Sequence, residues 1–349
     1  MAEKRRISRG DGPGFFVAAA ASAAAIFLAL LMVMVLAFGL PVIKESLDGG
    51  EGSLLSWQWN AGRGQFGILP MVAGSLSAAA CAAICAWPLA LGLCAVNLAA
   101  GPRRGPGAWL KKALAALVRF MTAVPTVIYG FASVFLLLPL WRDFMKTGAG
   151  YGLGPTIMVL SLLILPTMVL VMEAGFKNIY ARHSLAGAAL GFGPFQTFVF
   201  WVLPLGRSAL LSAFLLGFGR AIGDTLISLM LAGNAPQMPV GLSESFRTLT
   251  AHMALVTANE AGGQAYNSLF AAGTLVLLIS CAISLSARFL NSPGRKKTWG
   301  QGGRVITRLG KVRGLSSSFA VTRAMWPAET FKPPLNCGGA LPLRGAAAL

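Results

Sequence analysis

The chain has 349 residues, of which 56% are hydrophobic and only 11% charged, and its formal net charge is +18. This composition excludes an ordinary soluble domain, in which about a quarter of the residues are charged. No basic stripe with interleaved aromatic residues accompanies the positive charge, so we expect no nucleic-acid partner.

Six apolar stretches are long enough to cross a membrane as helices, which requires about 20 residues each. They cover residues 15–43, 67–100, 120–141, 154–172, 208–233 and 265–287. We therefore predict an all-α, polytopic integral membrane protein with six transmembrane helices in one domain, residues 15–290. The alternative, a set of buried helices in a soluble core, rarely needs stretches so long and so free of charge.

The basic residues predict the orientation of these helices. Lys4 and Arg5 precede the first stretch, and Arg103, Lys111 and Lys177 fall in the segments that would face the same side. Because short cytoplasmic segments carry an excess of Lys and Arg, both termini are expected in the cytoplasm. Residues 1–14 then form a basic cytoplasmic segment. A cleaved signal peptide is the alternative, but the first apolar stretch is longer than a typical signal core.

The third stretch contains Pro125 and Gly130, which should kink its helix; a gating hinge is the alternative. Cys81 and Cys85 share one face of the second helix. Without His, Asp or Glu nearby they are expected to pack rather than to bind a metal.

The segment from 173 to 204 has the length of a loop but the pattern of two short helices. Leu185, Ala188, Ala189 and Phe192 fit the first, and Pro194 can open a second in which apolar residues recur at helical spacing. We predict a compact cytoplasmic knob with Gly191 and Gly193 between its helices. Its apolar face would enter a groove on another protein or, alternatively, lie on lipid.

The fifth stretch reads "GFGRAIGDTLISLMLAGN" and places Arg220 and Asp224 within the membrane. Residues four apart share a helix face, so the two side chains are expected to pair, which would reduce the cost of the buried charge. Since a guanidinium can hold an oxyanion through two hydrogen bonds, we predict a substrate pathway at Arg220, Asp224 and Thr225. The alternative is a pair that only fixes helix packing.

Beyond this stretch, "GNAPQMP" ends the fifth helix in an outer turn, with a docking surface as the alternative. Leu242, Phe246, Leu249 and Met253 recur at helical spacing and predict an outer helix. His252 follows that face and is expected to be a packing or surface residue. The segment 291–349 is basic and rich in glycine, which predicts a disordered cytoplasmic tail attracted to anionic lipid, or alternatively a partner motif.

The segment 173–204 resembles the cytoplasmic coupling loop of ABC-importer permeases, whose pattern runs Glu-Ala-Ala, three residues, Gly, nine residues, Ile-x-Leu-Pro. Depending on the register, Leu185 or Gly187 takes the place of the usual Glu, so the acidic residue is missing in both. The resemblance implies that about residues 175–204 form the loop that couples to the ATPase. The residues it implies for this coupling are Leu185, Gly187, Ala188, Ala189, Gly191, Gly193, Leu203 and Pro204.

Four further stretches resemble the phosphate-importer permease subunits of type I (MetI-like) fold. They read "WQWNAGRGQFGILPMVAGSL", "AVPTVIYGFASVFLLLPL", "GFGRAIGDTLISLMLAGNAPQMP" and "FRTLTAHMAL", in this order. The family's usual Glu is Asp224 here.

The resemblance implies an inner-membrane phosphate permease that works by alternating access. Its implied partners are a second permease, two copies of a cytosolic ATPase, a periplasmic phosphate-binding protein and membrane lipid. The chain lacks G-x-x-x-x-G-K-[ST], so ATP and Mg would be bound by the ATPase, and this chain would bind no cofactor and be no enzyme. The alternatives are a permease for sulfate or molybdate, a channel or ion-coupled carrier, and a scaffold that senses phosphate status without transport.

Overall fold

The computed structural model describes residues 12–47, 54, 56–60, 63–99, 106–146, 148–259 and 263–291. The predicted tail from residue 292 on lies outside the described residues, as does the predicted N-terminal segment up to residue 11. The helices are α1 (Gly12–Leu47), α2 (Leu69–Ala99), α3 (Pro106–Ala123), α4 (Thr126–Met145), α5 (Leu153–Ala189), α6 (Pro194–Thr197), a π-helix (Phe198–Val202), α7 (Leu203–Leu205), α8 (Arg207–Ile222), α9 (Leu226–Leu231), α10 (Leu249–Asn259) and α11 (Gly263–Asn291). The strands β1 (Trp59–Asn60) and β2 (Gln65–Phe66) form a short antiparallel hairpin.

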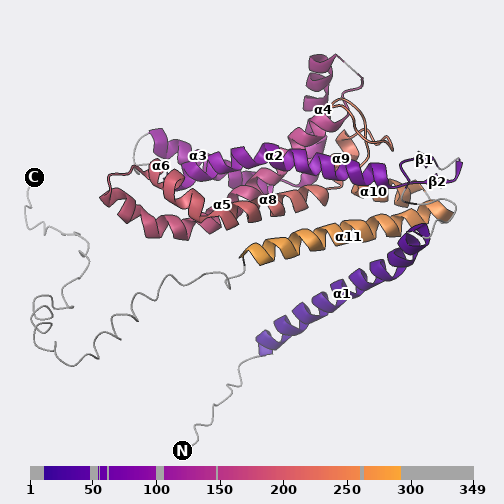
Figure 1. The fold of residues 1–349 in the computed structure, drawn as a ribbon, viewed down its shortest axis with the longest axis horizontal. Helices are drawn as coiled ribbons and strands as arrows, with labels where there is room; N and C mark the ends of the chain where they lie inside the picture. Colours follow the sequence, from indigo (N-terminus) through magenta and orange to yellow (C-terminus); the bar gives the residue numbers. More distant parts are fainter. Residues whose placement is uncertain are drawn as a thin grey trace, which may run out of the picture. The chain divides into compact units, whose positions relative to one another are not determined.

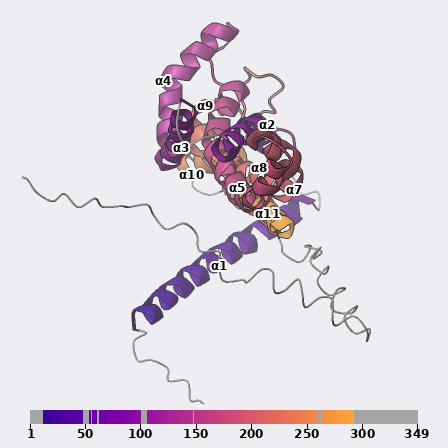
Figure 2. The same ribbon diagram turned by 90° about the vertical axis from the view of Figure 1, so that its left-hand side faces the viewer.

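Five of these helices, α1, α2, α4, α5 and α11, are long and apolar enough to span a membrane. A sixth span results if α8 is joined to the short helices before it, Pro194–Leu205, from which it is bent by 76°. The protein is therefore an all-α, multi-pass membrane protein, as the apolar stretches predict. Figures 1 and 2 show α2, α5 and α8 side by side, while α4 points away from them.

The core of the described residues lies between α2 and α5. Alanines recur every four residues on one side of α2, and Ala78, Ala82, Ala86 and Ala90 are fully or almost fully buried. Small side chains let the backbones approach closely, which is how helices associate in membranes. The facing helix α5 fills the space with large buried side chains, among them Leu160, Ile164, Met168 and Met172.

Helix α1 packs against α11 along one side and leaves most of its apolar side chains exposed. The contact is close at Gly39, where an added Cβ would collide with Thr274. The Thr274 hydroxyl donates a hydrogen bond to the carbonyl of Val35, 3.2 Å away. A helix that is apolar all round and mostly exposed in the single chain fits contact with lipid.

Two predicted helices differ from those found. The predicted stretch 120–141 is divided at Val124 and Pro125, and a helix that the sequence did not predict, α3, precedes the break. Residues before a proline are disfavoured in α-helical conformation, so Pro125 separates two helices instead of kinking one. The predicted outer helix begins only at Leu249; Leu242 and Phe246 precede it, and Phe246 is buried in the bridge to Gly233.

Candidate functional site

Helix α8 ends at Ile222 and α9 begins at Leu226, so the predicted stretch 208–233 is a broken helix. Asp224 lies in the break and is largely buried. Its Oδ2 accepts a hydrogen bond from the backbone N–H of Ile227, 2.8 Å away, and so caps the first turn of α9. The backbone carbonyl of Asp224 accepts a hydrogen bond from the Thr250 hydroxyl on α10 at 3.0 Å. Asp224 therefore holds the break in place and fastens it to α10.

The predicted ion pair between Arg220 and Asp224 is wrong. Both residues are described, and no nitrogen–oxygen distance of 4 Å or less joins them. The prediction assumed an unbroken helix, in which residues four apart share one face. The break at Gly223 turns the Asp224 carboxylate to the N–H groups of α9 instead.

Arg220 stands in the last turn of α8 with its side chain exposed in the single chain. Its Nη1 donates a hydrogen bond to Oγ1 of Thr167 on α5, 3.1 Å away. Its charge also acts electrostatically on Tyr129 of α4. The guanidinium thus lies where α8 packs against α5, and it is held by a neutral hydroxyl. Its remaining N–H donors are available to an anion because Arg carries five in a planar fork.

Thr225 faces a different space from Arg220. It lines a cavity of about 600 Å³ with residues of α1, α10 and α11, including Thr250, Met253 and Thr257. Neither Arg220 nor Asp224 lines this cavity. The described chain therefore does not bring the three predicted pathway residues to one surface.

The segment predicted as a knob contains a turn between two helical segments, but the first of these is the end of α5, which runs without interruption to Ala189. The chain turns at Gly191, whose φ of +78° strongly favours glycine, and α6 begins at Pro194. The side-chain Oε1 of Gln196 accepts a hydrogen bond from the Gly193 N–H at 2.8 Å. The knob is thus one extended helix, a tight turn and a second helical segment that bends into α8.

The knob is anchored by aromatic side chains on its inner side. Phe198 of the π-helix meets Phe176 of α5 edge to face, with ring centroids 5.6 Å apart, and both are buried. Gly187 is buried against Thr197. The outer side carries exposed apolar residues, namely Leu185 (81% exposed), Leu190 (64%) and Phe195 (62%). Ala188, Ala189 and Pro204 are exposed too, and Leu203 is half-buried.

The predicted hinge residues occupy a helix boundary and a packing contact. Pro125 precedes the first residue of α4 with extended backbone angles. Gly130 is buried, and an added Cβ would lie 2.6 Å from the sulfur of Met230 on α9. Gly130 therefore allows α4 to approach α9 closely.

Sequence reasoning missed Thr167, and it also missed a polar pair between α2 and α5. The Asn97 side-chain amide on α2 donates a hydrogen bond to Oε1 of Glu173, 2.5 Å away. Thr167 follows Pro166 inside an apolar stretch, and a hydroxyl in that setting is a signal that would have found it. The sequence predicts a loop at Glu173, whereas the structure places it in α5.

His252 belongs to a buried cluster beside the hairpin. Its Nε2 lies 3.2 Å from Oγ of Ser268, and its ring meets that of Trp59 edge to face, with centroids 4.4 Å apart. As predicted, it is a packing residue.

These helices define an all-α, multi-pass membrane protein, and comparison with known proteins identifies its fold as the MetI-type permease fold. Among solved structures, an inward-facing MetNI methionine ABC transporter matches with a TM-score of 0.50 and 19% sequence identity, over 64% of this chain and 95% of that chain. At this identity the match bears on the fold.

The chain belongs to the family of binding-protein-dependent transport system inner membrane components, whose model matches residues 92–297. It is 28% identical to the probable ABC transporter permease protein YqgH of Bacillus subtilis over 239 residues, which are 68% of this chain and 76% of that protein. It is also 25% identical to the phosphate transport system permease protein PstC of Haemophilus influenzae, over 70% of this chain and 82% of that protein. The relatives are permease subunits of transporters, so the chain is a transporter component.

Proposed function

We propose that this chain is the permease subunit of an ATP-driven importer that carries inorganic phosphate across the inner membrane. The observation that carries the proposal is the similarity to PstC proteins, which are named as phosphate transport permeases, over about 70% of the chain. Arg220 is the residue we assign to the substrate. Arg220 is exposed in the single chain, and its guanidinium donates a hydrogen bond to the hydroxyl of Thr167.

An exposed arginine in the last turn of a candidate membrane span needs a reason, because a charge inside the bilayer is costly, by at least about 2.5–3.5 kcal/mol at its centre. Contact with lipid would leave that cost uncompensated. A pathway that admits phosphate compensates it, since a guanidinium binds phosphate oxygens through two parallel hydrogen bonds. Thr167 would hold the side chain between passages and give it up to the anion.

In this proposal a second permease subunit completes the pathway at Arg220, because Arg220 is exposed in the single chain. Two copies of a cytosolic ATPase would dock on the two knobs, bind ATP and Mg, and drive alternating access. The apolar outer side of the knob, with Leu185, Leu190 and Phe195, supports this docking. A periplasmic binding protein would deliver phosphate, and both termini of this chain would be cytoplasmic.

Asp224 has a structural part in this proposal. Its carboxylate accepts the Ile227 N–H and so fixes the end of α8, from which Arg220 projects. Pathway geometry then depends on the break between α8 and α9.

The test is uptake of labelled phosphate by cells that express this chain with its candidate permease partner, ATPase and binding protein. An ATPase variant that cannot hydrolyse ATP serves as the control, and sulfate and molybdate serve as competitors. ATP-dependent uptake that the competitors leave unchanged supports phosphate as the substrate. Uptake suppressed by sulfate or molybdate favours another oxyanion. An assembled complex without flux of any of the three anions favours a scaffold that senses phosphate status.

Substitutions at Arg220 separate a substrate contact from a packing role. Arg220→Lys keeps the charge but loses the planar fork. If Arg220 contacts the anion, the variant assembles and its preference among phosphate, sulfate and molybdate changes. Normal assembly with unchanged preference contradicts the assignment.

A further inference from the structure

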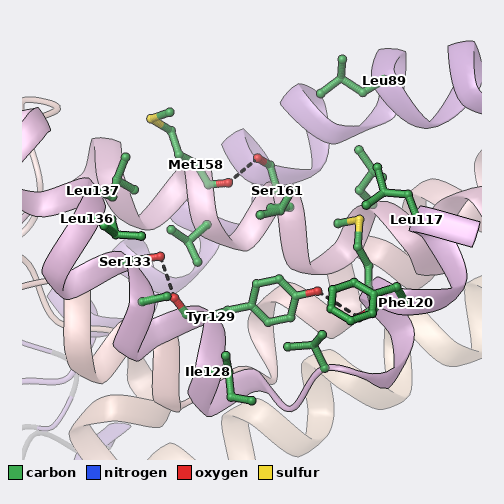
Figure 3. A pocket seen from close by; sticks show the side chains of 16 residues that line it. Leu89, Leu117, Phe120, Ile128, Tyr129, Ser133, Leu136, Leu137, Met158 and Ser161 are labelled. Atoms are coloured by element: carbon green, nitrogen blue, oxygen red, sulfur yellow. Dashed lines mark hydrogen bonds between the residues drawn. The ribbon is translucent and has the colours of Figure 1, made fainter. Parts of the chain in front are cut away.

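A second cavity, of about 650 Å³, opens on the side of the described chain formed by α3, α4 and α5, with Leu89 of α2 at its edge (Figure 3). We call it the α3–α5 groove. Its volume is that of a small-molecule site, for which about 300–1,000 Å³ is typical. Its lining is almost entirely apolar and includes Leu117, Phe120, Ile128, Leu136, Met158 and Leu162.

The hydroxyl groups in the groove are already satisfied by the protein. The Tyr129 hydroxyl donates to the carbonyl of Met121 at 2.9 Å, Ser133 to that of Tyr129 at 2.6 Å and Ser161 to that of Met158 at 2.7 Å (Figure 3). Each of these hydroxyls therefore uses its one donor in a hydrogen bond to a backbone carbonyl. The wall of the groove presents hydrocarbon to its occupant, so the groove suits an alkyl chain and does not suit an oxyanion.

Two lysines lie on α3 before the residues that line the groove. The C-terminal half of α3 contributes Leu117, Phe120 and Met121 to the lining. Lys111 and Lys112 lie about 8–9 Å before Leu117 at 1.5 Å per residue. Helix α3 contains no acidic residue that would neutralise them. Trp109, 73% exposed, lies one turn before Lys112, and tryptophan is enriched at the level of lipid headgroups.

We propose that the α3–α5 groove and the start of α3 form a binding site for an anionic phospholipid. One acyl chain lies in the groove, and the phosphate group lies at Lys111 and Lys112, with Trp109 beside it. The two lysines have no acidic neighbour on α3 and therefore favour a negative headgroup, and the apolar wall of the groove holds the acyl chain. The proposal concerns a bound lipid and is independent of the anion that the permease carries.

The test is binding of phosphatidylglycerol and of phosphatidylcholine, each with one fluorescent acyl chain, to the purified full-length chain in detergent. We expect phosphatidylglycerol to bind about thirtyfold more tightly, since each of the two lysines contributes on the order of 1 kcal/mol to anionic lipid binding and about 1.4 kcal/mol corresponds to a factor of ten. Inorganic phosphate should not displace phosphatidylglycerol, because the acyl chain of the lipid supplies part of its affinity. Equal binding of the two lipids, or displacement by inorganic phosphate, would overturn the proposal.

Two pairs of variants locate the site. The double variant Lys111→Gln, Lys112→Gln should abolish the preference for phosphatidylglycerol. The control is the double variant Arg142→Gln, Lys146→Gln at the C-terminal end of α4, which should preserve the preference. Ala132→Phe fills the groove and should weaken binding of both lipids, whereas Ala21→Phe, exposed on α1, should not. Retained preference in the lysine variant, or unchanged binding in Ala132→Phe, contradicts the assignment. Loss of bound lipid when the second permease assembles would instead show that the groove is a contact between subunits.

Discussion

Thr167 and Arg220 stand on different helices, 53 residues apart in the sequence, and are joined by a hydrogen bond of 3.1 Å from Nη1 to Oγ1. Thr167 belongs to α5, which continues into the knob, and Arg220 belongs to α8, which leads away from it. The two helices pack along much of their length. Any shift of α8 against α5 therefore changes how the guanidinium is held, which places Arg220 at a point where movement of the knob can reach the proposed pathway.

The hydroxyl of Thr167 can be removed while the shape of the side chain is kept. For Thr167→Val we expect phosphate uptake to fall about fivefold, because a hydrogen bond contributes roughly 1 kcal/mol and this one positions the guanidinium. The measurement is the initial rate of labelled phosphate uptake, normalised to the amount of assembled complex. Thr167→Ser is the control and should restore most of the rate. Equal rates in wild type and Thr167→Val would show that Thr167 does not position Arg220 for transport.

Asp224 is expected to act through its cap on α9. Asn caps a helix about as well as Asp, so Asp224→Asn should leave the thermal stability of the purified chain close to that of the wild type. Asp224→Ala removes the acceptor of the Ile227 N–H and should lower the free energy of unfolding by about 0.5–2 kcal/mol. Thermal unfolding of the three proteins in one detergent measures both effects. Equal losses in both variants would point to a role for the charge and would contradict the cap.

The course of the Arg220 segment shows what the sequence predicts and where it fails. Its apolar length predicts a membrane span over 208–233, whereas in the structure α8 forms a candidate span only together with the preceding short helices, Pro194–Leu205. The sequence "IGDT" also contains signals of a break, a glycine that can end a helix and an aspartate that can cap the next. Helical spacing alone could not show which of two uses of Asp224, the cap or the pair with Arg220, would be realised.

In the knob segment, the sequence predicts the turn and the start of the second helix correctly, but it does not predict how far α5 extends. The turn at Gly191 and the start of a helix at Pro194 follow from the backbone preferences of these residues, and the structure contains both. The continuity of α5 through residues 173–189 was not predicted. The polar residues there end the apolar stretch, but none of them stops a helix, which continues until a glycine allows the turn. The end of an apolar stretch predicts where a segment leaves the lipid, whereas residues such as glycine and proline predict where its helix ends.

The apolar outer side of the knob is expected to bind the ATPase. Phe195 is 62% exposed in α6, so Phe195→Ala should leave the fold intact and weaken retention of the ATPase in co-purification several-fold, as loss of an aromatic anchor does at interfaces. The matched control is Phe131→Ala, which removes an equally exposed ring (60%) from α4. Its ATPase retention should equal that of the wild type. A loss of the same size in both variants would indicate a general effect on folding and would remove the knob as the docking site.

The buried imidazole of His252 predicts how stability depends on pH. Burial, with a smaller contribution from the positive charge of Arg247, lowers the pKa of His252 to about 4, from 6.5 for a free side chain. Between these values the unfolded chain takes up a proton that the folded chain refuses, so the stabilisation present above pH 6.5 is lost as the pH falls towards 4. The loss can reach about 1.4 kcal/mol per pH unit.

This dependence can be measured as the midpoint of thermal unfolding of the full-length chain at several pH values from 7 to 4. His252→Gln cannot be protonated, so its midpoint should change less with pH than that of the wild type, although it should be less stable at pH 7 because a packed ring is lost. His183→Gln replaces the other histidine of the chain, which contacts Trp201 near the knob, and should keep the wild-type dependence. A wild-type slope that survives in His252→Gln would show that other groups cause it, and the His252 cluster would then have no part in acid sensitivity.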